Sequence, residues 1–250
     1  MKYLIDIYRE VKQTTDGIRP SFLPTTIVQG GSGPNAGQVI YTPPRGEGVI
    51  TEMLNNLLEF INNDQKFPID PLIKMAMAHY QFEAIHPFRD GNGRTGRIFN
   101  IHILTKKGLL EYPILYLSRY IIENKSEYYS RLQSVSQKGM WKEWIIYMLK
   151  AVEETSNLTF RKINELIKVK DAFLIEISKN TGFKRPELIT NLIFTQPFTR
   201  VKHLTNRNDY AENTARAYLN KLSEMGILEK KTFHGHHYYL NLELYRILSE

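Results

Sequence analysis

The segment from His86 to Arg97, HPFRDGNGRTGR, constrains the fold of this chain more than any other feature. On both sides of it apolar residues recur with helical spacing, so the segment is predicted to be a loop that joins two helices. Pro87 disfavours helical geometry at His86, which places the end of the first helix there. Gly91 and Gly93 permit backbone conformations in which several N–H groups face one point, beside the positively polarised start of the second helix. The loop is therefore predicted to bind an anion.

The charged residues of this loop match the needs of a metal-bound nucleotide. Arg94 and Arg97 lie one turn apart on the second helix, so together they can bind more than one phosphate. Asp90 would repel phosphate unless a divalent cation lies between them, and Mg²⁺ binds carboxylate and phosphate oxygens together. His86 has the pKa range of a general base near neutral pH. A lone histidine or glycine-rich turn more often belongs to an ordinary helix–loop–helix connection, but this combination predicts transfer of a group from a nucleotide.

Around the loop, the first part of the chain is predicted to be mainly helical. Residues 29–48 are rich in glycine and proline, and within them Val39-Ile40-Tyr41 has the β-branched and aromatic composition of one arm of a hairpin. Apolar spacing and helix-start signals predict helices at residues 1–12, at Val49–Asn62, from Asp70-Pro71 onward, after the loop as far as Leu104, and through most of residues 115–170.

After Thr181-Gly182-Phe183 the pattern changes to short elements. Three helical patterns precede two strand-like runs that flank a turn at residues 234–237, and this order is typical of a winged helix. The helical patterns are Glu187–Phe194, Thr199–Thr205 and Ala211–Met225, and the strand-like runs are Ile227–Phe233 and Tyr238–Asn241. A domain boundary is expected near residues 170–180.

Composition narrows the classes of site and partner. Cysteine is absent, which excludes disulfides, thiol nucleophiles and cysteine metal sites. No run of about 18 apolar residues occurs, so a membrane span is not expected. The N-terminus lacks the apolar core and cleavage site of a signal peptide, and the cytoplasm is the expected compartment. The net charge of +7 favours polyanionic partners: a nucleotide, a nucleic acid or an acidic protein face.

The loop resembles the motif of the Fic (Fido) family, HxFx[D/E]GNGRxxR, and matches it at every defined position. Further segments resemble the helical core of that family: HYQFEAIHPF, PILYLS, SEYYSRL and WKEWIIYML. The resemblance covers residues 1–160, and the C-terminal part resembles winged-helix domains appended to such cores. It implies a mainly α fold, with a Fic core at residues 1–170, a β-hairpin flap at about 29–48, the active loop at 86–97 and a winged-helix domain at 171–250.

The resemblance also implies an activity, that of a protein adenylyltransferase. Such an enzyme moves AMP from ATP to a Ser, Thr or Tyr hydroxyl of a target protein and releases pyrophosphate. By motif position, His86 would be the general base, and Asp90 would hold Mg²⁺ between the α- and β-phosphates. The nucleotide would be bound by the backbone N–H groups of Gly91, Asn92 and Gly93, by the side chains of Arg94 and Arg97, and by Tyr128 at the adenine.

Two parts of this assignment leave alternatives open. Tyr129 could replace Tyr128 at the adenine, and either tyrosine could belong to the core instead. The flap would dock the target protein by strand addition, through main-chain hydrogen bonds that tolerate many sequences. The flap residues are Val39, Ile40, Tyr41 and Thr42. A PGxxR-like segment, which precedes the flap in relatives, is not recognisable here, so the approach of the flap is expected to differ.

Members of the family also transfer UMP, phosphocholine or phosphate, and removal of AMP from a target stays open. Gly93 and the intact arginine pair favour AMP transfer, because the phosphate-transferring branch has a bulkier residue in place of that glycine. Many relatives carry an inhibitory motif, [S/T]xxxE[G/N], which is not found here. Each candidate glutamate lacks the hydroxyl residue: Glu47, Glu123 and Glu212 follow Pro43, Arg119 and Asn208. We expect the chain to be a fragment that lacks this motif, rather than to rely on a partner or act unrestrained.

A second class of function is a DNA-binding regulator whose core senses nucleotide without catalysis. The expected recognition helix, Ala211–Met225, carries Arg216 and Lys221, and other basic residues are nearby at Lys202, Arg207, Lys230 and Lys231. Glu212 and Glu224 dilute this charge, so protein docking or homodimer formation is favoured over DNA binding. The histidines at 234, 236 and 237 are expected to form a solvated wing tip rather than a metal site.

Overall fold

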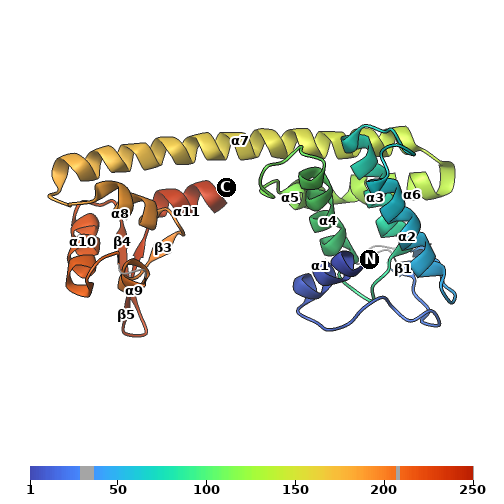
Figure 1. Cartoon of the computed structure of the whole chain (residues 1–250), viewed down its shortest axis with the longest axis horizontal. Helices are drawn as coiled ribbons and strands as arrows, with labels where there is room; N and C mark the ends of the chain where they lie inside the picture. Colours follow the sequence, from blue (N-terminus) through green and yellow to red (C-terminus); the bar gives the residue numbers. More distant parts are fainter. Residues whose placement is uncertain (29–36, 207–208, 250) are drawn as a thin grey trace. The chain divides into compact units, whose positions relative to one another are not determined.

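The computed structural model describes residues 1–28, 37–206 and 209–249 (Figure 1). The chain divides into two compact units, unit 1 at Met1–Asn157 and unit 2 at Leu158–Glu250. Helix α7 (Trp141–Asn180) begins in unit 1 and continues into unit 2. Most of the described chain is helical and its sheets are small and antiparallel, which confirms the predicted mainly α class.

Unit 1 is a set of packed helices with one two-stranded ribbon. Asp70 caps α3 by accepting hydrogen bonds from the N–H groups of Leu72 and Ile73, as the Asp-Pro signal predicts. Helix α3 packs against α2 and α4, and α4 also packs against α1. The elements of unit 1 are α1 (Lys2–Lys12), β1 (Ile27–Val28), β2 (Val39–Tyr41), α2 (Val49–Asn62), α3 (Pro71–Ile85), α4 (Asn92–Lys106), α5 (Leu117–Glu123), α6 (Lys125–Lys138) and the start of α7.

The core of unit 1 holds the loop between α3 and α4 in place. Trp144 is fully buried, and its indole N–H donates a hydrogen bond to the carbonyl of Ala76 at 2.8 Å. Phe88, the large apolar side chain of the loop, is also fully buried and stacks on Tyr8 of α1, with 3.8 Å between the ring centroids. The packing of this ring therefore anchors the loop.

The ribbon of unit 1 is formed by β1 and β2, which pair antiparallel. Ile27 lies opposite Tyr41, and Val28 lies opposite Val39 after a shift of register. The predicted strand at Val39–Tyr41 is confirmed, whereas residues 29–36 of the predicted flap lie outside the described residues.

Unit 2 contains the predicted order of short helices followed by a hairpin. Its three-stranded antiparallel sheet has the order β3-β5-β4. Apolar residues of α7, α8, α9 and α10 pack with Tyr239 of β5 in its core. The elements are α8 (Pro186–Ile193), β3 (Phe198–Thr199), α9 (Val201–Thr205), α10 (Glu212–Glu224), β4 (Glu229–Phe233), β5 (His236–Leu240) and α11 (Leu242–Ser249).

Three details of the C-terminal prediction are wrong. Thr199 belongs to strand β3, because its backbone pairs with Tyr239 of β5, and not to a helix. His236 and His237 belong to β5, so the turn of the hairpin contains only His234 and Gly235, both at positive φ as a tight hairpin turn requires. Helix α11 was not predicted and follows β5 directly.

No helix within the described residues has both the length and the apolar composition needed to cross a bilayer.

Candidate active site

His86 lies at the C-terminal end of α3 in a left-handed backbone conformation, with φ at 48°. This conformation ends the helix and turns the chain into the loop. Arg19, which is almost fully buried, binds the same corner: its Nε donates to the carbonyl of His86 at 2.8 Å and its Nη2 to the carbonyl of Pro44 at 2.5 Å. The cation satisfies carbonyl groups at the end of α3 and connects them to the segment after β2. Burial lowers the pKa of His86 below its usual value.

The turn into α4 is held by the side chain of Asn92. Its amide oxygen accepts from the N–H of Phe88, and its amide nitrogen donates to the carbonyl of the same residue. Gly91 has φ at 82°, which a residue with a side chain rarely adopts. Helix α4 begins at Asn92, and the first N–H groups of a helix have no partner within it. The predicted anion-binding position thus coincides with a helix N-terminus.

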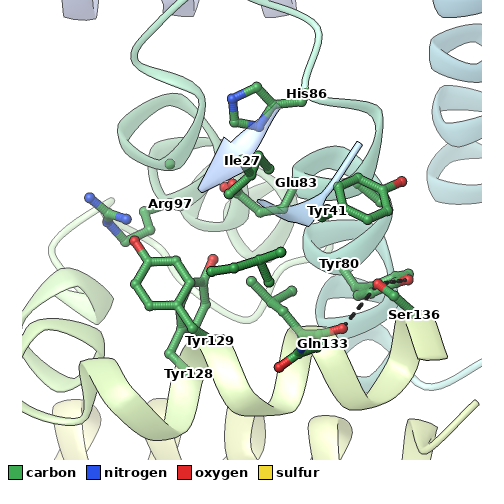
Figure 2. A pocket seen from close by; sticks show the side chains of 14 residues that line it. Ile27, Tyr41, Tyr80, Glu83, His86, Arg97, Tyr128, Tyr129, Gln133 and Ser136 are labelled. Carbon is green, nitrogen blue, oxygen red and sulfur yellow. Dashed lines mark hydrogen bonds between the residues drawn. The ribbon is translucent and has the colours of Figure 1, made fainter. Parts of the chain in front are cut away.

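One cavity in unit 1 brings together several of the predicted site residues (Figure 2). His86 lies at one end of this view, and Tyr128 and Tyr129 lie at the other. The predicted residues that line it are Ile40, Tyr41, His86, Gly93, Arg97 and Tyr128. The other lining residues are Ile27, Tyr80, Glu83, Ala84, Tyr129, Leu132, Gln133 and Ser136. We call this space the α3–α6 cavity, since its walls come mainly from these two helices, the start of α4 and the ribbon.

The remaining predicted site residues do not line the α3–α6 cavity. Arg94 instead lines a neighbouring groove with Pro113 and Tyr116, and Arg97 borders both spaces. Val39 is exposed on the ribbon and Thr42 is exposed just after β2. Asp90 and Gly91 belong to the turn ahead of α4, and Asn92 is the first residue of α4.

Arg97 is held by α5 and is crowded by α4. Its Nε donates to the hydroxyl of Ser118 at 3.0 Å. A Cβ atom at Gly93 would lie 3.1 Å from Nη1 of Arg97, so a larger residue at position 93 would press on this guanidinium. Glycine at this position therefore leaves room for the arginine beside the cavity.

Asp90 forms a salt bridge with a lysine side chain in this structure. Nζ of Lys12, from the end of α1, lies 2.5 Å from its Oδ2, and Nη2 of Arg94 lies 3.8 Å from the same oxygen. The hydrogen bond from Lys12 is the main cause that holds the pKa of Asp90 below its usual range. The sequence motif gives no sign of Lys12, because only the fold brings α1 to the loop.

We expect Lys12→Met to raise the pKa of Asp90 toward the value of a free aspartate, because the carboxylate loses its closest cation. The change can be followed as the pH dependence of the Asp90 carboxyl ¹³C shift by NMR. Lys66→Met is the matched control, since Lys66 pairs with Glu59 at 2.9 Å elsewhere on unit 1. An unchanged pKa of Asp90 in Lys12→Met, or an equal rise in Lys66→Met, would contradict the assignment.

Tyr128 is buried at the far end of the cavity. Its hydroxyl lies 3.0 Å from Nε2 of His79. Burial lowers the pKa of His79 to about 3, so its ring is neutral at physiological pH. Tyr129 is about half exposed and also lines the cavity, so both tyrosines considered for the adenine are present in its wall.

Glu83 is a further ionisable residue of the cavity that sequence analysis missed. It lies one turn before His86 on α3, and burial raises its pKa to about 7 although Arg97 opposes the shift. Its Oε1 atom is buried without a hydrogen-bond partner among the described residues. The periodicity of α3 gives no sign of this, because a glutamate on a helix is normally exposed.

Three of the basic residues considered for DNA binding in unit 2 are paired with nearby acids. Arg216 pairs with Glu212 at 2.7 Å, and Lys221 lies 3.8 Å from Glu224. On the hairpin, Lys231 pairs with Glu229 at 2.5 Å, and Lys230 donates to the side chain of Asn220 at 2.9 Å. Arg207 lies outside the described residues.

Two family models match the chain. Residues 1–104 match the Fic/DOC family, and residues 179–244 match the model described as Protein adenylyltransferase SoFic-like, C-terminal domain. Protein adenylyltransferase fic-1 of Caenorhabditis elegans is 30% identical over 150 residues, which are 60% of this chain and 26% of that protein. Protein adenylyltransferase Fic of Aedes aegypti is 29% identical over 167 residues, 66% of this chain and 30% of that protein. The chain thus spans less than a third of these curated relatives.

A solved structure has a similar fold. The crystal structure of a Fic family protein from Desulfovibrio desulfuricans G20 matches with a TM-score of 0.54 and 19% identity. The match covers 95% of this chain and 67% of that one.

Proposed function

We propose that this chain is a protein adenylyltransferase of the Fic/DOC family, which moves AMP from ATP to a hydroxyl of a target protein, because residues 1–104 match that family and residues 179–244 match the SoFic-like C-terminal domain. The observation that carries the proposal is that His86, Gly93 and Arg97 share the wall of the α3–α6 cavity (Figure 2). A base, the start of a helix and a cation thus meet at one space that also contains two tyrosine rings. The curated relatives are named protein adenylyltransferases, which supports the same chemistry here.

In the proposed reaction, His86 accepts the proton of a Ser, Thr or Tyr hydroxyl on the target. The hydroxyl oxygen forms a bond to the α-phosphorus of ATP, the bond between the α-phosphorus and the bridging oxygen breaks, and pyrophosphate leaves. Burial lowers the pKa of His86, so its ring is neutral and ready to accept a proton at neutral pH. The buried Arg19 holds the backbone of His86 in position for this step.

The leaving pyrophosphate would be bound at the start of α4. The N–H groups of Asn92 and Gly93 at the start of α4 would donate to its oxygens, as helix N-termini do for phosphates, together with the N–H of Gly91, which interacts with the carboxylate of Asp90 in this structure. Arg97 would support the β-phosphate and Arg94 the γ-phosphate. Such groups accelerate transfer by positioning the phosphates and by stabilising the charge that develops on them.

The residues present fit Mg²⁺ only if the nucleotide supplies most of its ligands. No cluster of three or more His, Asp or Glu side chains suited to a metal occurs in the described part of the chain. Asp90 offers one carboxylate that already attracts Lys12, so this position favours a cation. Mg²⁺ normally binds through one or two carboxylates together with substrate phosphates, where it neutralises the charge of the transferring group. Asp90 would hold it, and Lys12 would then be free to face a phosphate.

The target protein would bind along β2. Its partner strand β1 occupies one edge, and no second strand pairs with β2 among the residues that the structure describes. An extended segment of the target could add to the other edge through main-chain hydrogen bonds. Ile40 and Tyr41 line the cavity, so a segment docked there would carry its hydroxyl toward His86.

The test uses the full chain, Mg²⁺ and ATP labelled at either the α- or the γ-phosphate, with a cell lysate as the source of targets. We expect protein to acquire label from α-labelled ATP and none from γ-labelled ATP. Label from the γ-phosphate would show phosphate transfer instead. Label from α-labelled UTP but not ATP would show that another nucleotide is used.

Residues 171–250 are proposed to form a winged-helix module that docks protein or a second copy of the chain. DNA binding is the weaker alternative, because the acids beside Arg216, Lys221 and Lys231 reduce the charge available to phosphates. If no nucleotide gives label and the chain binds duplex DNA in a salt-sensitive way, the DNA-binding regulator becomes the better description.

A further inference from the structure

Two residues of α3 and the residue that directly follows this helix line the α3–α6 cavity at successive turns. They are Tyr80, Glu83 and His86, each three positions apart. A helix rises about 1.5 Å per residue, so neighbouring members of this row are about 4.5 Å apart along the helix axis. Figure 2 shows the same order, with Glu83 between the ring of His86 and that of Tyr80. Along the cavity wall the order is therefore His86 at one end, then Glu83, then Tyr80.

The order of these residues along the wall can be compared with the order of phosphate, ribose and base in a nucleotide. If the α-phosphate lies beside His86, as the proposed function requires, the next part of the nucleotide is its ribose. The aromatic end of the cavity, with Tyr128 and Tyr129, suits the planar base that follows. On this placement Glu83 would lie at the depth of the sugar, and Arg97, whose charge acts on Glu83, would lie on its phosphate side.

The carboxyl group of Glu83 packs closely against the cavity wall. Its Oε1 packs against α4, where a Cβ atom at Gly96 would lie only 2.7 Å away. Any larger residue at position 96 would displace the carboxyl, so the glycine makes room for it. The cavity wall also contains apolar side chains, among them Ile27, Ile40 and Ala84, and the charge of Arg97 acts on Glu83.

A carboxyl group in the wall of a cavity needs hydrogen-bond donors. Its Oε1 is buried against α4 and has none among the described residues, so a ligand in the cavity would bind the carboxyl group through the other oxygen. Phosphate cannot supply donors and would repel an ionised carboxylate. The vicinal hydroxyls of ribose can donate two hydrogen bonds to one carboxylate, and acidic residues bind ribose hydroxyls in this way in dinucleotide sites.

We propose that Glu83 accepts hydrogen bonds from the ribose hydroxyls of the nucleotide, so that the cavity selects ribonucleotides over deoxyribonucleotides. The inference rests on the proposed function for the placement of the α-phosphate. It adds a residue that determines substrate specificity. A site built to bind a hydroxyl strongly disfavours an analogue that lacks it, because its own polar group is then left unpaired.

The experiment measures binding by calorimetry of the full chain with Mg²⁺ and α,β-methylene ATP, which cannot be cleaved between the α- and β-phosphates. The 2′-deoxy and 3′-deoxy forms of the same analogue are compared with it. Glu83→Ala and Glu83→Met are tested beside the wild type, since methionine keeps the length of the side chain without its oxygens. Glu52→Ala is the control, because Glu52 is an exposed acid on α2 that does not line the cavity. Folding of each variant is checked by tryptophan fluorescence.

We expect the wild type and Glu52→Ala to bind the ribose form at least about tenfold more tightly than one or both deoxy forms. In Glu83→Ala and Glu83→Met this ratio should fall below about threefold, mainly through weaker binding of the ribose form. A wild-type ratio below threefold, or an unchanged ratio in both folded variants, would overturn the inference. Failure of all three analogues to bind would also overturn it.

Transfer from α-labelled ATP, measured in parallel, separates this inference from the proposed function. Transfer without discrimination between ribose and deoxyribose overturns the role of Glu83 and leaves the activity standing. Discrimination that depends on Glu83, without any transfer, overturns the activity and leaves the nucleotide-binding role standing.

Discussion

Replacing His86 by asparagine is expected to slow AMP transfer by about 100-fold or more, because a general base contributes about 10²–10⁴-fold. Asparagine cannot accept the proton of the target hydroxyl at neutral pH. It is preferable to alanine as the test, since His86 has φ at 48° and asparagine tolerates this conformation better than most residues. His86→Ala should lose at least as much activity, but with added backbone strain.

The measurement is the initial rate of label transfer from α-labelled ATP, with nucleotide affinity determined separately. Affinity should change little in His86→Asn, because the proposed role of His86 is toward the target hydroxyl. The control is His237→Asn, which changes an exposed histidine of β5 in unit 2. A rate within tenfold of the wild type in a folded His86→Asn protein would remove His86 from the reaction.

The same role predicts the direction of the pH dependence. A base acts in its deprotonated form, so the wild-type rate should rise with pH through the pKa of His86 and then level off. Because burial lowers this pKa, the midpoint should lie below about 6.5, the value of a free histidine. A midpoint above that value would mean that another group limits the rate.

Local signals were sufficient for several elements of the fold. Val49–Asn62 and the start of α3 at Asp70-Pro71 were predicted because apolar spacing and a capping residue act within a few positions of the chain. Strand β3 and the full length of β5 were not predicted. Both are defined by backbone pairing with strands that lie elsewhere in the sequence. Helix α7 likewise runs through the break between the two units, and no residue in the sequence marks that break.

In the candidate site, too, residues that depend on long-range packing were not predicted from the sequence. The motif made it possible to predict His86, Gly93 and Arg97, and all three line one cavity. Lys12 and Glu83 were missed, because their surroundings come from helices far apart in sequence. Lys12 reaches Asp90 across 78 positions, and the unusual pKa of Glu83 arises only when α3 packs on α4. The motif therefore predicts which groups would react, whereas the residues that contact them are found only from the packing of the helices.

Arg19 is such a supporting residue, and its loss is expected to affect both stability and activity. Its guanidinium donates to the carbonyls of His86 and Pro44, and to that of Ile85 at 3.4 Å. Arg19→Ala would leave these partly buried carbonyls without a donor, and each costs about 1–3 kcal/mol when unpaired. We expect the free energy of unfolding of unit 1 to fall by about 2–4 kcal/mol. The rate of transfer should fall as well, since His86 would lose its backbone support.

Urea unfolding followed by tryptophan fluorescence tests this expectation in unit 1 alone. The two tryptophans of the chain, Trp141 and Trp144, both belong to that unit, so unfolding of unit 2 does not contribute to the signal. Arg19→Lys should lose less stability than Arg19→Ala, because an ammonium keeps the charge at the end of α3 but cannot reach three carbonyls in the geometry of a guanidinium. Arg45→Ala removes a neighbouring exposed arginine and should change stability by less than about 0.5 kcal/mol. If Arg19→Ala unfolds at the same urea concentration as the wild type, the contacts of Arg19 do not stabilise the corner at His86.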